Sequence, residues 1–131
     1  MKTAIISFLK TFVIFFACDF IWLTRISPAF YKEHIGHLMA ETPNLPAALA
    51  FYLIFIAGLT YFAVLPSAEK YKPARAFGQG AFFGLVTYAT FDLTSQAVLK
   101  DWPTIVTLVD LAWGSILSGV TTTIAAKISR R

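Results

Sequence analysis

The sequence predicts an all-α fold, a bundle of four transmembrane helices with an amphipathic interfacial helix between the first and second spans. Hydrophobic residues make up 57% of the 131 positions and charged residues only 14%, whereas soluble domains carry about 25% charged residues. The mean hydropathy is +0.68. This composition excludes a disordered chain, which would be poor in apolar residues, and the single cysteine, Cys18, excludes an intramolecular disulfide scaffold.

Four apolar runs are long enough to cross a bilayer, since a transmembrane helix needs about 20 mainly apolar residues. They cover about residues 3–24, 45–65, 76–99 and 102–126. Prolines mark their limits: Pro46 and Pro103 fall in the first turns of the second and fourth runs, and Pro66 closes the second. We therefore expect residues 1–131 to form a single integral membrane domain without a separate soluble part.

The segment 28–40, between the first two spans, is predicted to be an amphipathic helix that begins at Ser27-Pro28. Its apolar side chains share one face: Tyr31, Ile35, Leu38 and Met39. Such a helix would lie on the outer membrane surface or cap the bundle. His34 and His37 are three residues apart, a spacing that suits a metal, but two histidines are weak evidence and we expect no metal site.

Basic residues gather at one end of the predicted bundle. Eight of the eleven Lys and Arg residues lie there: Lys2, Lys10, Lys70, Lys72, Arg75, Lys127, Arg130 and Arg131. The opposite end carries Arg25, Lys32 and Lys100. The positive-inside rule therefore places both termini in the cytoplasm. A basic cytoplasmic rim also accounts for the net charge of +4, so no nucleic-acid partner is expected.

The N-terminal run has a second interpretation. Met1-Lys2 before an apolar stretch resembles a signal peptide, and Ala17-Cys18 resembles a lipoprotein cleavage site. However, Phe15 and Phe16 are bulky where such sites require small residues, and the apolar stretch continues beyond Cys18. We therefore expect a retained first span.

Three carboxylates fall inside the predicted spans: Asp19, Asp92 and Asp110. Counting residues from the outer helix ends places all three at one depth, about 9–10 Å from the outer surface. Intramembrane carboxylates are costly and usually face the bundle interior for a functional reason. The three cannot all ionise without a counter-charge, so we expect one to hold a proton or a bound cation to neutralise them. Asp92 is the expected proton holder, because its helix has no basic residue until Lys100.

Aromatic and polar residues at this depth complete a candidate ligand-binding pocket that opens toward the outer leaflet. Its residues are Asp19, Trp22, Tyr52, Tyr88, Asp92, Gln96, Asp110 and Trp113. Asp19–Trp22 and Asp110–Trp113 repeat the pattern Asp-x-x-Trp, in which the indole N–H is within reach of its own carboxylate. The alternative interpretation is that these groups only join helices through hydrogen bonds.

Small residues predict close helix packing at Gly80-x-x-x-Gly84 and along Gly114, Ser118 and Thr122. Packing inside one bundle is the favoured use of these residues, and a homodimer is the alternative. No phosphate-binding glycine loop, zinc motif or nucleophile elbow occurs in the sequence. No cofactor is therefore expected.

Three spaced blocks resemble a known family: Asp19-Phe-Ile-Trp22-Leu, Tyr88-Ala-Thr-Phe-Asp92-Leu-Thr94 followed by Trp102-Pro103, and Asp110-Leu-Ala-Trp113-Gly114. The chain is similar, over nearly its whole length, to uncharacterised bacterial four-span membrane proteins grouped as a domain of unknown function. That family favours Tyr at the position of Phe91 and Asn at that of Ser95. The resemblance implies a four-helix protein of the bacterial inner membrane, and it implies no activity.

The leading functional hypothesis is a membrane protein that binds, and by extension transports, a small polar or cationic ligand at the aspartate pocket. The alternative is a membrane enzyme that acts on a lipid or isoprenoid, with an aspartate as general acid or base. A third hypothesis is a structural or assembly subunit of a membrane complex. The sequence does not decide whether the protein is an enzyme, and the bilayer is the one partner it predicts directly.

Overall fold

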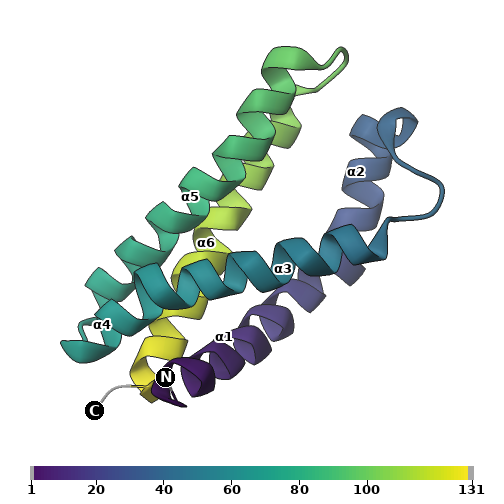
Figure 1. Ribbon diagram of the computed structural model, residues 1–131. Coiled ribbons are helices and arrows are strands. Elements are labelled where there is room, and N and C mark those ends of the chain that lie inside the picture. The colour runs from purple at the N-terminus through teal and green to yellow at the C-terminus, as the bar shows by residue number, and fades with distance from the viewer. Residues whose placement is uncertain (1, 130–131) are drawn as a thin grey trace.

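The computed structural model describes residues 2–129, and this part of the chain is mostly helical and contains no strand (Figure 1). In chain order the elements are α1 (Lys2–Ile21), η1 (Trp22–Ile26), α2 (Ser27–Ile35), η2 (Gly36–Leu38), α3 (Leu45–Leu59), η3 (Thr60–Val64), α4 (Leu65–Glu69), α5 (Pro73–Val98) and α6 (Thr104–Ser129). The all-α prediction is confirmed.

Three continuous helices are long and apolar enough to cross a membrane. They are Lys2–Leu38, Leu45–Glu69 and Thr104–Ser129. Helix α5 has 26 residues, as many as α6, but its glycines and its Thr, Ser and Gln side chains make it less apolar. Crossing of the bilayer by α5, and hence the count of four spans, therefore stays a prediction.

Two π-helical turns carry helices past positions where the sequence predicts a break. At η1 the Ser27 N–H bonds to the Trp22 carbonyl, so α1 continues directly into α2 and bends there (Figure 1). At η3 the Leu65 N–H bonds to the Thr60 carbonyl, and the helix ends at Glu69 instead of at Pro66. In both places the proline is the second residue of the α-helical segment that follows the wide turn, a position at which proline is tolerated.

The interfacial helix is slightly shorter than predicted, and it is continuous with the first span. It comprises α2 and η2, ends at Leu38, and is attached to the first span without a loop. None of its residues is buried. The short connection to α3 ends at Asn44, whose side chain accepts a hydrogen bond of 3.1 Å from the Ala47 N–H and so caps that helix.

Helices α5 and α6 form an antiparallel hairpin along which glycines allow close approach (Figure 1). A Cβ placed on Gly84 would lie 2.8 Å from the Cβ of Ser118, and one on Gly80 would lie 2.6 Å from the Cβ of Thr122. A side chain at either glycine would therefore push the helices apart. The small-residue seam is thus used inside the chain.

The remaining helices pack against this hairpin. Helix α1 runs antiparallel to α6, and Lys10 Nζ donates to the Ile128 carbonyl at 3.1 Å. Between α1, α3 and α6 lies an apolar core of Phe15, Phe55, Ile56, Leu59, Ala63 and Leu117. In the connection between α4 and α5, Tyr71 donates to the Thr123 carbonyl at 3.1 Å. Helices α1 and α4 and the η3 turn thus contact α6 directly, and α3 packs against α1.

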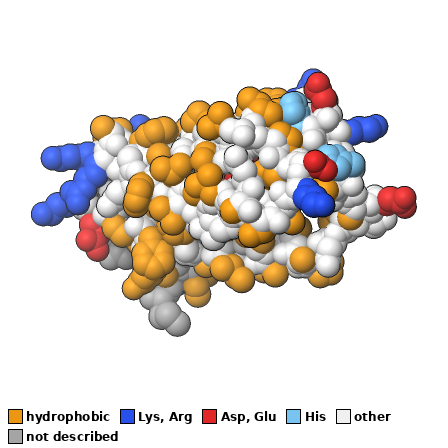
Figure 2. Space-filling model, turned by 90° about the horizontal axis from the view of Figure 1, so that it is seen from above, with side chains coloured by type: hydrophobic (Ala, Val, Ile, Leu, Met, Phe, Trp, Pro, Cys, Tyr) orange, Lys and Arg blue, Asp and Glu red, His pale blue; other side chains and the backbone are white. Residues whose placement is uncertain are grey.

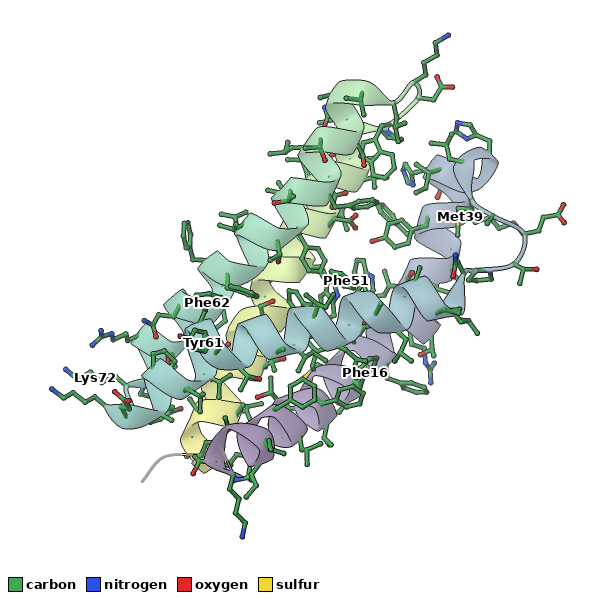
Figure 3. The ribbon with its side chains drawn as sticks, in the orientation of Figure 1. Phe16, Met39, Phe51, Tyr61, Phe62 and Lys72 are labelled. Atoms are coloured by element: carbon green, nitrogen blue, oxygen red, sulfur yellow. The ribbon has the colours of Figure 1, made fainter. Side chains whose placement is uncertain are left out.

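Charge and exposure follow the pattern of a protein in lipid. Figure 2 shows Lys and Arg side chains at the two ends of the molecule and hydrophobic side chains over the middle. Figure 3 shows Lys72 and Met39 toward opposite ends. Tyr61 and Phe62, which lie between them, are each 64% exposed. Exposure of these aromatic rings is unfavourable in water but not in lipid. Arg130 and Arg131, which count toward the predicted orientation, lie outside the described residues.

Candidate functional site

The two Asp-x-x-Trp segments meet where α1 crosses α6. The rings of Trp22 and Trp113 stack with centroids 4.7 Å apart and an interplanar angle of 10°. Trp113 Nε1 donates to Asp19 Oδ1 at 3.3 Å. The sequence places this indole within reach of Asp110 on its own helix, but the indole donates to Asp19 instead, because the antiparallel pairing of the helices brings that carboxylate to it.

Asp19 is almost completely buried, at 3% exposure, and its partners are neutral donors. Besides Trp113, the Tyr52 hydroxyl of α3 donates to Asp19 Oδ2 at 3.4 Å. Among residues 2–129 the ion pair found is His37–Asp101, at 3.7 Å and exposed. Within residues 2–129, no Lys, Arg or His therefore lies within ion-pair distance of Asp19.

Asp110 receives its hydrogen bond from α2. The Tyr31 hydroxyl donates to Asp110 Oδ1, and the Tyr31 ring meets Trp22 edge-on with centroids 6.3 Å apart. Tyr31 was expected on the apolar face of the interfacial helix, and its role at the site was not predicted. The signal available in the sequence was the hydroxyl itself, a polar group on an otherwise apolar face.

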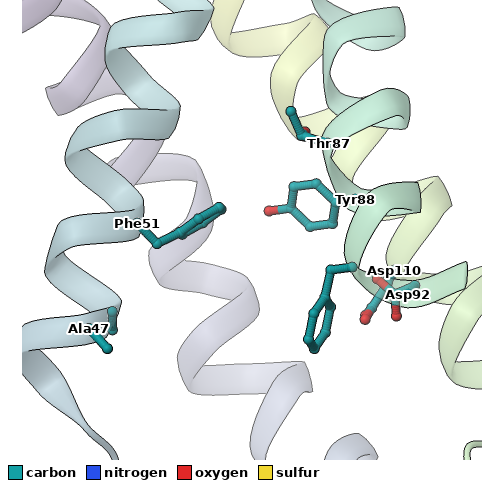
Figure 4. A pocket seen from close by; sticks show the side chains of 8 residues that line it. Ala47, Phe51, Thr87, Tyr88, Asp92 and Asp110 are labelled. Atoms are coloured by element: carbon teal, nitrogen blue, oxygen red, sulfur yellow. The ribbon is translucent and has the colours of Figure 1, made fainter. Parts of the chain in front are cut away.

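Asp92 on α5 is fully buried and lies beside Asp110 at the α5–α6 interface (Figure 4). Among the residues described, no donor reaches either of its carboxyl oxygens. Two adjacent carboxyl groups in an apolar environment repel each other if both are ionised, and one shared proton removes this repulsion while supplying a hydrogen bond. We call Asp92 and Asp110 the acid pair.

A small cavity of about 170 Å³ lies among the rings around Asp19. It is lined by Asp19, Trp22, Leu23, Ser27, Tyr31, Tyr52, Tyr88 and Trp113, and we call it the aromatic cage. Five of the eight residues singled out in the sequence line it. Two Trp and three Tyr side chains surround a single carboxylate, so the cage combines aromatic faces with one negative charge.

A larger cavity of about 470 Å³ lies between α3 and α5. It is lined by Ala47, Ala48, Phe51, Thr87, Tyr88, Phe91, Asp92 and Asp110, and we call it the interhelical cleft. Figure 4 shows Ala47 and Phe51 on one wall, with Tyr88 and the acid pair on the other. Tyr88 lines both cavities, so the single pocket expected from the sequence consists of two adjacent ones.

Gln96 lines neither cavity. Its side chain donates to Thr104 Oγ1 at 3.1 Å, and so it joins the end of α5 to the start of α6. The two histidines of the interfacial helix have different partners. His34 Nδ1 lies 2.9 Å from the Phe30 carbonyl oxygen, and His37 lies 3.7 Å from the Asp101 carboxylate. Within residues 2–129 no three potential metal ligands come together.

Comparison with known proteins identifies one family. The family model described as "Predicted membrane protein (DUF2177)" matches residues 4–127. No curated protein and no solved structure matches the chain. The match covers nearly every residue, including both cavities and all of the helices that build them, and the chain therefore belongs to this family of predicted membrane proteins, whose function is unknown.

Proposed function

We propose that this protein binds a small organic cation in the aromatic cage, with Asp19 as the counter-charge. The observation that carries the proposal is the environment of Asp19, a buried carboxylate with two neutral donors and no basic partner among the described residues. A buried charge without a partner is costly. A bound cation would supply the missing charge.

The rings of the cage support the same ligand. A cation held over an aromatic face gains about 0.5–1 kcal/mol at an exposed site and about 2 kcal/mol or more when desolvated. Trp22, Trp113 and Tyr31 come from three different helical segments, so a bound ion could contact several faces at once. The volume of about 170 Å³ is below the about 300–1,000 Å³ of ordinary ligand pockets, and it suits a methylated ammonium group.

The proposed setting is the bacterial inner membrane, with four spans and both termini in the cytoplasm. Helix α5 packs along α6, which is long and apolar enough to cross, and a partner so closely packed would cross with it. The excess of Lys and Arg at the end that holds the α4–α5 turn supports the orientation. The aromatic cage would then face the outer leaflet.

The acid pair favours a second candidate, a membrane enzyme acting on a lipid or isoprenoid. A protonated carboxyl group beside an ionised one can act as general acid or base, and Asp92 and Asp110 lie on an apolar cavity that would hold such a substrate. Turnover of a lipid substrate that is lost in Asp92→Asn while cation binding persists would favour this candidate.

Cation binding can be measured by the fluorescence of the cage itself. In a Trp102→Phe background the remaining indoles are Trp22 and Trp113, so a saturable change in emission reports on the cage. We expect choline to produce this change and its neutral carbon analogue, 3,3-dimethyl-1-butanol, to produce none. Asp19→Asn should weaken choline binding by about tenfold or more, a loss of about 1.4 kcal/mol.

Asp101→Asn is the matched control, because Asp101 is an exposed acid of the α5–α6 turn. Its backbone φ is 63°, a conformation that Asn tolerates. This variant should bind choline as the parent does. Equal binding of the neutral analogue, or unchanged affinity in Asp19→Asn, would refute the proposal.

A further inference from the structure

We propose that the natural ligand is a cationic amphiphile with a single apolar chain. Its ammonium group would occupy the aromatic cage and its chain would lie in the interhelical cleft, which it enters from the bilayer between α3 and α5. This inference rests on the proposed function and specifies the class of ligand.

The two cavities are adjacent and complementary in chemistry. Tyr88 lines both of them, so a molecule held in the cage can extend past this ring into the cleft. The cleft has a wall of Ala47, Ala48 and Phe51 on α3 (Figure 4). Its volume of about 470 Å³ falls within the about 300–1,000 Å³ range of ligand pockets. Apart from the acid pair, its wall is largely apolar, and the part formed by α3 suits a hydrocarbon.

The cleft is open toward the surface that faces lipid. Helix α5 is held to the second span mainly near η3 and α4, where Ser67 Oγ donates to Gln79 Oε1 at 2.5 Å. Toward the α2 end, α3 and α5 diverge (Figure 1). Phe51 and Phe91, which line the cleft on its two sides, are 47% and 60% exposed. A chain can therefore enter sideways without leaving an apolar environment.

The acid pair restricts the head group. An anionic or zwitterionic phospholipid would bring a phosphate close to Asp92 and Asp110, which already lack a basic partner among the described residues. The phosphate and the carboxylate would repel each other strongly, because like charges that lie close together away from water are only weakly screened. A cation without a phosphate avoids this repulsion, because the acid pair with one shared proton still carries a single negative charge.

The test compares alkyltrimethylammonium ions with chains from methyl to hexyl, titrated into the Trp102→Phe background. Each methylene that enters the cleft should raise the affinity about fourfold, which corresponds to about 0.8 kcal/mol. Ala47→Phe fills the cleft from its α3 wall and should abolish this gain while leaving tetramethylammonium affinity unchanged. Ala50→Phe adds the same ring to an exposed position on α3 outside the cavity and should keep the gain.

Partition of the longer chains into detergent affects all variants alike, so the comparison between Ala47→Phe and Ala50→Phe isolates the cleft. Retained tetramethylammonium binding shows that a variant is folded, and Ala47→Leu replaces Ala47→Phe if it is not. Equal gains in the two variants, or no gain in the parent, would overturn the amphiphile while the cation site stands. Equal affinity for hexylphosphocholine would overturn the charge argument. Absence of tetramethylammonium binding in the parent would overturn the proposed function itself.

Discussion

Substitution of Gly84 by alanine tests the close packing that places the acid pair. A Cβ at this position would lie 2.6 Å from Ser118 Oγ and 2.8 Å from Ser118 Cβ, and closer still to the Gly114 carbonyl oxygen. The Ser118 hydroxyl can rotate away, but the carbonyl and the Cβ belong to the framework of α6. The helices must therefore move apart, and overpacking of this kind costs about 1–3 kcal/mol.

Gly78 provides the control on the same helix, because a Cβ there would meet nothing within 4 Å. Gly78→Ala should stabilise the helix slightly, since glycine inside a helix is about 0.5–1 kcal/mol less favourable than alanine. The two variants carry the same chemical change. The gain in helix propensity is common to both and cancels, so we expect their free energies of unfolding to differ by the overpacking cost alone, about 1–3 kcal/mol.

The free energy of unfolding can be measured by titrating SDS into detergent micelles and following the helical circular dichroism signal. Asp92 lies eight residues beyond Gly84 on α5, about two helical turns, so separation of the helices should also move it away from Asp110. If Gly84→Ala is as stable as Gly78→Ala, α5 and α6 do not approach each other through this glycine and the reasoning fails.

Three further predictions concern the site and its orientation. Trp113→Phe should keep an aromatic ring against Trp22 but lower the free energy of unfolding by about 1–3 kcal/mol, because a buried carboxylate loses one of its two donors. Asp92→Asn should unfold like the wild type at neutral pH, since its amide can donate as the shared proton does. Asp92→Ala should be less stable in the same SDS titration. A marked loss of stability in Asp92→Asn would show that an ionised Asp92 is required. A reporter active only in the cytoplasm should be active after residue 131 and silent at Glu41, and the reverse pattern would invert the orientation.

The helices, and the proximity of Asp19 to the second Asp-x-x-Trp segment, could be predicted because both depend on counting along one helix. Apolar run lengths set the spans, and the rise per residue places Asp19 and Asp110 near each other on antiparallel helices. The structure brings these residues together around the Trp22–Trp113 stack. Local geometry was sufficient for this part of the site.

The course of the chain at Pro28 and Pro66 could not be predicted in the same way. A proline is compatible with the end of one helix or with the first turn of the next. Here a π-helical turn precedes each proline and keeps the helix continuous. A single turn of this kind is too short to be recognised from the hydrophobic pattern of the sequence. The packing of the finished bundle decides between the alternatives.

Partners across helices were equally beyond the sequence. Gln96 shares a helix face with Asp92, yet its side chain donates to Thr104. The turn between α5 and α6 brings the Thr104 hydroxyl close to the end of α5, where Gln96 lies. Trp113 is within one turn of Asp110, yet it donates to Asp19. Rotation of each helix about its axis determines these pairings, and that rotation depends on contacts such as those of Gly84 with α6.

The three carboxylates differ in what the protein supplies to each, and the difference follows from the elements around them. Asp19 faces α3 and α6, which provide the Tyr52 and Trp113 donors. Asp110 has one donor, from α2, and Asp92, turned into the α5–α6 seam, has none among the described residues. Asp19 is thus the carboxylate best prepared to carry a charge, and the acid pair the one best prepared to hold a proton. A cation is therefore expected to bind at Asp19 rather than at the acid pair.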